Sequence, residues 1–262
     1  MKLKLKYVII VLSLITSCKK EISPGENINC SSDNEQIQMN PMELIDLGLS
    51  VKWGQANIGA MSVADCGSYF AWGELKSKSR DDEEGYFNSS YLFTDGQPIS
   101  KYCTDPEYGT LDGNKVLLLA DDVSNVRLGE DWRIPSDNEW RELKNPENCS
   151  WTWTTMNGMS GYKVQSKKPG FTDNWIFLPA GGEMEGNVQF NKGTCGSYWS
   201  SSLFEGYPHQ AKCFDFTQDK IYNCRAFRYA GKNVRPVYGT YIVNNKDVYI
   251  GSIENEGFQT EE

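Results

Sequence analysis

Two cysteines near the C-terminal end of the chain have the spacing that points most directly to chemistry. Cys213 and Cys224 stand on either side of Gln218-Asp219. A two-residue turn there would pair Thr217 with Lys220 and set the cysteines opposite each other on neighbouring strands, within bridging distance. Gln-Asp is not among the favoured hairpin turns, yet this register predicts a Cys213–Cys224 disulfide.

The other residues that could carry chemistry form no catalytic pattern. The one histidine, His209, follows Pro208 in an expected solvated loop, too little for a histidine metal cluster or a Ser-His-Asp triad. Gly181–Gly186 lacks the lysine of a phosphate-binding loop. Carboxylates are abundant, but no local spacing indicates a glycosidase pair. The sequence therefore predicts a protein that is not an enzyme and has no catalytic residue, metal or cofactor.

The first residues of the chain predict export and a lipid anchor. Three lysines precede an apolar run over Tyr7–Ile15, which is typical of a signal peptide (1–17) and too short for a permanent membrane span. Ile15-Thr16-Ser17-Cys18 has the form of a lipobox, so Cys18 is expected to carry a lipid that anchors the protein to the bacterial outer membrane. Residues 18–40 are polar and predict a flexible tether. Exposure at the cell surface and a periplasmic orientation both stay open.

The charge balance argues against a nucleic-acid partner. The chain has 26 Lys and Arg against 35 Asp and Glu, a net charge of −9, and loss of the signal peptide would remove three of the lysines. A surface of this sign repels phosphate backbones. The aromatic content of 13% favours a strand-rich domain.

The best-defined local element is a short helix near the middle of the chain. Ser136 followed by Glu139 predicts a capping box, Trp140 and Leu143 share one helical face, and Asn145-Pro146 ends the run. A second short helix is expected after Asp121-Asp122, with an aspartate cap favoured over a calcium site.

Short strands are expected over most of the remaining chain. Ile45–Trp53 alternates apolar and polar residues, which predicts a strand with one buried face, and Trp175–Leu178 suits a central strand. Lys76–Asp112 predicts a long excursion over the surface. Further strands are expected in Ser68–Glu74, Trp151–Trp153, Tyr162–Val164, Tyr198-Trp199, Lys212–Phe216, Ile221–Tyr229 and Val234–Tyr238, with a terminal hairpin around Asn244–Asp247.

Several motifs resemble known families. Trp132-Arg133-Ile134-Pro135-Ser136, with Glu139-Trp140 after it, matches a helix start found in the Fibrobacter succinogenes major paralogous domain family of bacterial surface proteins and in the formylglycine-generating sulfatase-modifying-factor family. The first resemblance is much longer. It also includes Leu44–Trp53, Asn57–Ala60, Tyr69–Glu74, Trp151–Thr155, Gly161–Val164, Ile176–Gly182, Tyr198–Ser202 and Gly231–Val237.

The resemblance implies an α+β, C-type-lectin-like domain over residues 41–238, strand-rich, with one or two short helices and long loops. A hairpin and an acidic tail would follow over 239–262. In this arrangement the first and last strands lie together and the long loops occupy one end. The formylglycine enzymes bind copper through two cysteines, which makes a copper oxidase using Cys213 and Cys224 one alternative. A subunit of a surface filament is another.

The expected function is binding or adhesion through the long loops, with a glycan or a surface protein as ligand. No calcium-dependent sugar motif of the C-type lectins is matched. Exposed aromatic side chains supply contact area at small entropic cost. The candidate ligand-binding residues are Tyr86, Phe87, Tyr91 and Phe93 in the excursion, and Phe204 and Tyr207 near His209.

Overall fold

The computed structural model describes residues 42–78, 85–94, 98–129, 131–243 and 246–248, which belong to one compact unit, Met39–Glu262. The expected signal peptide (1–17), the lipidated Cys18, the tether (18–40) and the acidic tail beyond residue 248 lie outside these residues. In the described part of the chain, no helix combines the length and apolar character needed to cross a membrane.

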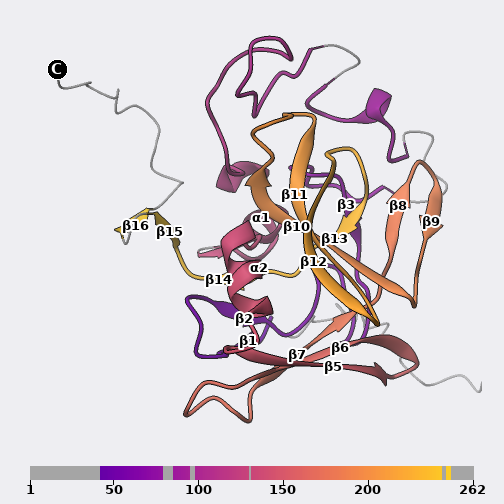
Figure 1. The fold of residues 1–262 in the computed structure, drawn as a ribbon. Coiled ribbons are helices and arrows are strands. Elements are labelled where there is room, and N and C mark those ends of the chain that lie inside the picture. The colour runs from indigo at the N-terminus through magenta and orange to yellow at the C-terminus, as the bar shows by residue number, and fades with distance from the viewer. Residues whose placement is uncertain (1–41, 79–84, 95–97, 130, 244–245, 249–262) are drawn as a thin grey trace, which may run out of the picture. The chain divides into compact units, whose positions relative to one another are not determined.

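Strands dominate the fold, as expected for the α+β class (Figure 1). A five-stranded sheet has the order β12 (Lys220–Phe227), β11 (Gln210–Thr217), β10 (Cys195–Leu203), β13 (Lys232–Asn233) and β3 (Tyr69–Phe70). A four-stranded sheet has the order β1 (Leu44–Ile45), β2 (Lys52–Gly54), β14 (Val237–Tyr238) and β4 (Trp132–Arg133). A three-stranded sheet contains β5 (Cys149–Met156), β6 (Met159–Ser166) and β7 (Trp175–Pro179). Two separate hairpins are β8 (Glu183–Glu185) with β9 (Val188–Phe190), and β15 (Tyr241–Val243) with β16 (Lys246–Val248).

The described helices are short: α1 (Val123–Leu128), α2 (Asp137–Lys144) and the 3₁₀ turns η1 (Asn88–Ser90) and η2 (Leu119–Asp121). The predicted capping box of α2 is confirmed, because Ser136 Oγ accepts from the Glu139 amide at 3.3 Å and the Glu139 carboxylate accepts from the Ser136 amide at 2.7 Å. The predicted cap of α1 is also confirmed, since the Asp122 carboxylate accepts from two amides of the first turn.

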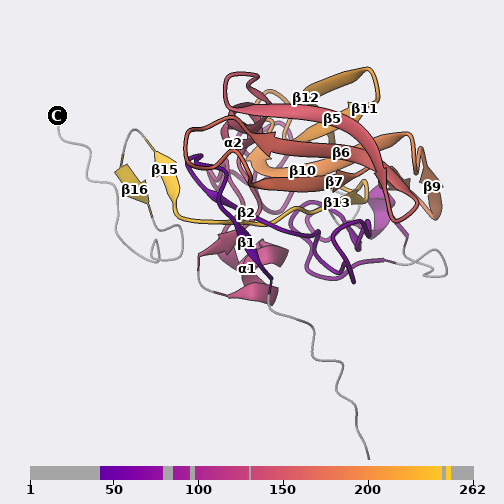
Figure 2. The same cartoon turned by 90° about the horizontal axis from the view of Figure 1, so that it is seen from below.

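The helix α2 lies between the sheets and joins them through one aromatic core. Its Trp140 stacks on Phe214 of β11, with ring centroids 4.4 Å apart, and is tilted against Trp53 of β2 at 4.9 Å. Trp151 and Tyr162 of the three-stranded sheet pack into the same core, from the side seen nearest in Figure 2. The three-stranded sheet therefore closes one end of the five-stranded sheet.

The opposite end of the five-stranded sheet carries the loops. In Figure 1 the purple segment after residue 98 arches over this end, near the β10–β11 connection. A strand from the start of the domain, β2, pairs with one from its end, β14, through Trp53 and Val237.

Three strand predictions need correction. Ile45–Trp53 is not one strand, because the chain reverses at Gly48 (φ +69°), and β1 pairs with β2 in an antiparallel hairpin. The expected strand over Ser68–Glu74 is reduced to β3. The apolar run Trp175–Leu178 was expected in a central strand, but it forms β7 at the edge of its sheet. The Arg235 guanidinium covers this strand and donates to the Phe177 carbonyl at 2.6 Å.

Two hairpin predictions are confirmed. Strands β11 and β12 pair Thr217 with Lys220 and Cys213 with Cys224, the register expected from the sequence. The terminal hairpin also forms, with β15 over Tyr241–Val243 and β16 over Lys246–Val248.

Candidate ligand-binding surface

Three of the candidate ligand-binding residues lie in the core, so we correct that expectation. Tyr86 is 0% exposed, Tyr91 2% and Phe93 6%. The hydroxyl of Tyr86 donates to the Tyr69 carbonyl at 2.5 Å, and that of Tyr91 donates to the Trp72 carbonyl at 2.6 Å. These side chains hold the excursion against the five-stranded sheet and have no surface to offer a ligand.

Two of these residues, Tyr91 and Phe93, lie with Trp72 around a buried arginine. The guanidinium carbon of Arg228 lies 5.2 Å from the ring centroid of Tyr91, 5.3 Å from that of Trp72 and 5.7 Å from that of Phe93. Its nitrogens donate to the Tyr91 hydroxyl and to the carbonyls of Lys101, Tyr102 and Pro208. Arg228 thus ties the excursion to the loop before β11.

That loop and the end of β12 form a partly exposed group of rings, which we call the aromatic strip. The ring centroids of Tyr108 and His209 each lie 5.2 Å from the ring centroid of Tyr207. Phe227 lies 6.4 Å from Tyr207 and stacks on Tyr229 at 5.3 Å. Phe227 is 42% exposed and the other rings are half-buried, so the strip offers ring faces to solvent.

His209 lies within this strip instead of being free in solvent as expected. Its ring meets those of Tyr108 and Tyr207. Burial lowers the pKa of the imidazole, and the nearby charge of Arg228 lowers it further. A neutral imidazole at pH 7 can donate and accept hydrogen bonds beside the stacked rings.

The other two candidate residues have separate surroundings. Phe204 is half-buried and lies against the guanidinium of Arg225, 4.4 Å from ring centroid to guanidinium carbon. Phe87 is 44% exposed beside Gly186, and no ring contact joins it to the strip in the described residues. The structure therefore brings Tyr207 into an aromatic surface, places Phe204 beside a cation and leaves Phe87 apart.

Sequence reasoning missed Tyr108, Phe227 and Tyr229 as members of this surface. Arg225, Phe227 and Tyr229 follow one another at every second position of a predicted strand, so their side chains are expected on one face. That alternation could have marked them. Nothing local connects Tyr108 to them, because it lies about 100 residues earlier in the chain.

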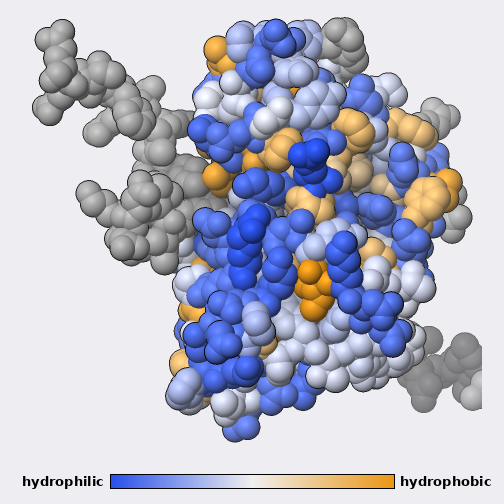
Figure 3. Space-filling view, in the orientation of Figure 1, coloured by the Kyte–Doolittle hydropathy of each residue, from blue (hydrophilic) through white to orange (hydrophobic). Residues whose placement is uncertain are grey.

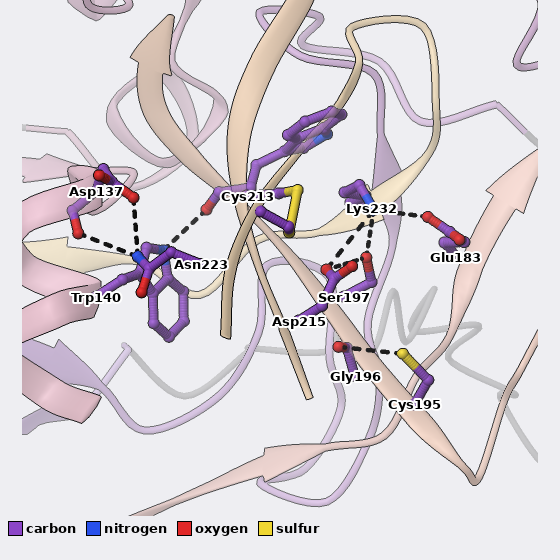
Figure 4. Close-up of a disulfide and its surroundings, with 12 residues drawn as sticks. Asp137, Trp140, Glu183, Cys195, Gly196, Ser197, Cys213, Asp215, Asn223 and Lys232 are labelled. Atoms are coloured by element: carbon purple, nitrogen blue, oxygen red, sulfur yellow. Dashed lines mark hydrogen bonds and ion pairs between the residues drawn. A yellow bond between two sulfur atoms is a disulfide. The ribbon is translucent and has the colours of Figure 1, made fainter. Parts of the chain in front are cut away.

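The disulfide lies on the other face of the same hairpin (Figure 4). Cys213 and Cys224 are bridged with their Cα atoms 4.9 Å apart, which confirms the predicted pairing. In the described residues, the one group able to hold a metal is these two cysteines with Asp215, whose ligand atoms lie within 4.8 Å of one another. A copper site of the formylglycine type would need both thiols reduced.

A buried lysine network lies beside the disulfide (Figure 4). Lys232 Nζ lies 2.6 Å from the Glu183 carboxylate and 3.8 Å from that of Asp215, and donates to Ser197 Oγ at 2.5 Å. Burial alone would lower the pKa of Lys232, but the two carboxylates outweigh it and the pKa is raised. Since Lys232 and Ser197 are each 1% exposed, this Ser-Lys pair has no access to a substrate and joins β13 to β10.

Figure 3 views the molecule with β11 and β12 in front, where hydrophobic residues form small groups among hydrophilic ones. Scattered hydrophobic groups of this kind are normal on a folded domain, and the described residues of this face carry no large apolar patch. Comparison of the chain with protein-family models, with curated proteins and with solved structures finds no match.

Proposed function

We propose that this protein is a lipid-anchored surface protein of the Fibrobacter succinogenes major paralogous domain family, with a C-type-lectin-like domain that binds a glycan. Cys18 would carry the lipid, and the loop end of the five-stranded sheet would face the ligand. The observation that carries the proposal is the aromatic strip. The β2–β14 pairing and the position of the long excursion support the lectin-like arrangement.

The chemistry of the strip suits sugar rings better than a protein partner. A pyranose has an apolar C–H face that packs on an aromatic ring, while its hydroxyls need nearby polar atoms. Tyr108, Tyr207 and Tyr229 supply both kinds of contact, and neutral His209 adds a donor and an acceptor. The rings are held by one another and by the Arg228 contacts behind them, so little side-chain entropy is lost on binding.

The test is a glycan-array screen of the purified chain followed by titration of the best glycan. Phe227→Ala and Tyr207→Ala should each weaken binding about tenfold, since one stacked ring contributes on the order of 1.4 kcal/mol. Phe190→Ala is the matched control, because Phe190 is also 42% exposed but lies on β9. Equal affinity of the Phe227→Ala, Tyr207→Ala and Phe190→Ala variants would refute the strip as the binding site. Absence of any bound glycan would refute the proposed glycan-binding function.

A further inference from the structure

The chain is acidic, yet one part of its surface is basic. Two neighbouring hollows flank α2, one of about 280 Å³ and one of about 560 Å³. The first is lined by three cations and one carboxylate: Arg141, Lys212, Arg225 and Asp137. The second is also lined by three cations and one carboxylate: Lys144, Lys167, Lys220 and Asp219. Six cationic groups thus face two carboxylates in a chain whose net charge is −9.

The two hollows lie one after the other along the seam between α2 and β12. Ile221, Asn223 and Arg225 alternate along β12 and so share one face of the strand. Asn223 lies between them, and its Nδ2 donates to Asp137 Oδ1 at 2.8 Å (Figure 4). Its Oδ1 accepts from Nζ of Lys144, which lines the second hollow, at 2.8 Å. Lys220 alternates with Ile221 along β12, and its Nζ lies over Tyr222 on the other face of the strand, so it is not part of this surface. The other five cations, Arg141, Lys144, Lys167, Lys212 and Arg225, lie along the seam, and we call them the basic band.

Little within the described residues neutralises this charge. Asp137 is shared by Arg141, at 2.9 Å, and by Lys212, at 3.5 Å, so one carboxylate faces two cations. Arg225 has no ion pair in the described part of the chain and lies against Phe204.

The lysines of the second hollow contact neutral groups. Lys144 donates to Asn223, and Lys167 to the Pro146 carbonyl at 2.6 Å. Lys220 lies 4.7 Å from the ring centroid of Tyr222. Hydrophilic residues cover most of the surface over α2 and β12, with small hydrophobic groups among them (Figure 3).

We propose that the basic band binds an acidic polysaccharide, a glycan whose carboxylate or sulfate groups are spread along its length. This inference rests on the proposed glycan-binding function and names the class of glycan. Phe227 follows Arg225 by two residues on the same face of β12, so the band runs directly into the aromatic strip. One chain could place sugar rings on the strip and anionic groups on the band.

Charge density favours a polysaccharide over a nucleic acid. The surface outside the band is more acidic than the chain as a whole, because the band has five cations beside only two carboxylates, Asp137 and Asp219. A nucleic-acid backbone carries densely spaced phosphates, and the acidic surface around the band would repel them. A polysaccharide with one charge per sugar or per disaccharide can meet the two hollows and leave the acidic surface uncontacted.

The test compares four probes of similar length with the full chain: a hyaluronan oligosaccharide, an oligogalacturonate, a neutral oligosaccharide and single-stranded DNA. The band variant is Lys167→Gln with Arg225→Gln, one change in each hollow. The matched control is Lys76→Gln with Lys192→Gln, which removes the same charge from exposed positions elsewhere. Affinities are measured at several salt concentrations.

We expect the acidic glycans to bind the wild-type chain most tightly. The band variant should lose about tenfold in affinity for them, and the slope of log affinity against log salt should fall by about 2. The control should change affinity less than twofold. Tighter binding of DNA than of both acidic glycans, or equal loss in band and control variants, would overturn the proposal. If the band proposal fails but the neutral oligosaccharide binds in a way that depends on Phe227, the proposed glycan-binding function still holds. If no glycan binds, both the band proposal and the proposed function are refuted.

Discussion

Replacement of Arg228 by methionine should destabilise the domain strongly. Arg228 is 1% exposed, and methionine keeps much of the apolar stem while removing the guanidinium. The change leaves four acceptors without their donor: the Tyr91 hydroxyl and the carbonyls of Lys101, Tyr102 and Pro208. At about 1 kcal/mol for each lost bond, the loss is about 4 kcal/mol.

Two further effects act in opposite directions. The guanidinium also loses its attraction to the surrounding rings, worth up to about 2 kcal/mol when desolvated. Removal of a buried charge recovers part of the cost of taking it out of water. We therefore expect a net loss of about 3 to 4 kcal/mol, or roughly 10 °C in Tm for a domain of this size.

The assay is urea unfolding followed by tryptophan fluorescence, with hydrogen exchange of the amides between residues 98 and 112. Arg127→Met is the matched control, because Arg127 also lies over a ring, that of Phe70 at 4.9 Å, but is exposed and donates to one carbonyl, that of Leu75. It should cost about 0.5 kcal/mol. A loss below about 1 kcal/mol for Arg228→Met, with unchanged exchange in the excursion, would refute the assigned role of the buried arginine.

Two other perturbations test the hairpin and the histidine. Replacing Cys213 and Cys224 together by alanine should lower the free energy of unfolding by about 2 to 3 kcal/mol, because the bridge closes a short loop. Urea titration with and without reductant measures this free energy, and reductant should not affect the double variant. The lowered pKa of His209 means that the unfolded chain takes up a proton more readily than the folded one. Stability should therefore fall as the pH drops below about 6.5, the ordinary pKa of histidine, and level off below the folded pKa. His209→Gln should remove this part of the pH dependence, and the imidazole proton shifts of the single histidine report the folded pKa directly.

The helix start and the disulfide could be predicted because both depend on residues close together in the chain. The capping box needs Ser136 and Glu139, three residues apart, and the backbone geometry of a helix start brings them into contact wherever the helix lies. The disulfide needs a tight turn and a register of eight paired residues in each strand. Once the turn forms, every later pair follows from the two-residue period of the strands.

The candidate site was less predictable because exposure depends on the packing of distant segments. Tyr86, Tyr91 and Phe93 were expected at the surface, since the excursion around them is rich in polar residues. Tyr91 and Phe93 pack around Arg228, which is 137 residues after Tyr91, and Tyr86 donates to the Tyr69 carbonyl, so all three are buried against distant parts of the chain or the sheet. The net charge argued against a nucleic-acid partner, and a sum over the chain does not reveal that five of its cations line one seam.

The sequence by itself determined the strand-rich class, the two capped helices and the register of the disulfide hairpin, since turns, caps and alternation act over a few residues. The tertiary structure alone decided which aromatic residues reach solvent and which cations gather beside α2. Those outcomes depend on contacts between segments more than 80 residues apart, such as Asn223 with Asp137 and Tyr108 with Tyr207. Such contacts form only when burial of the common core has positioned the sheets, and no local preference encodes them.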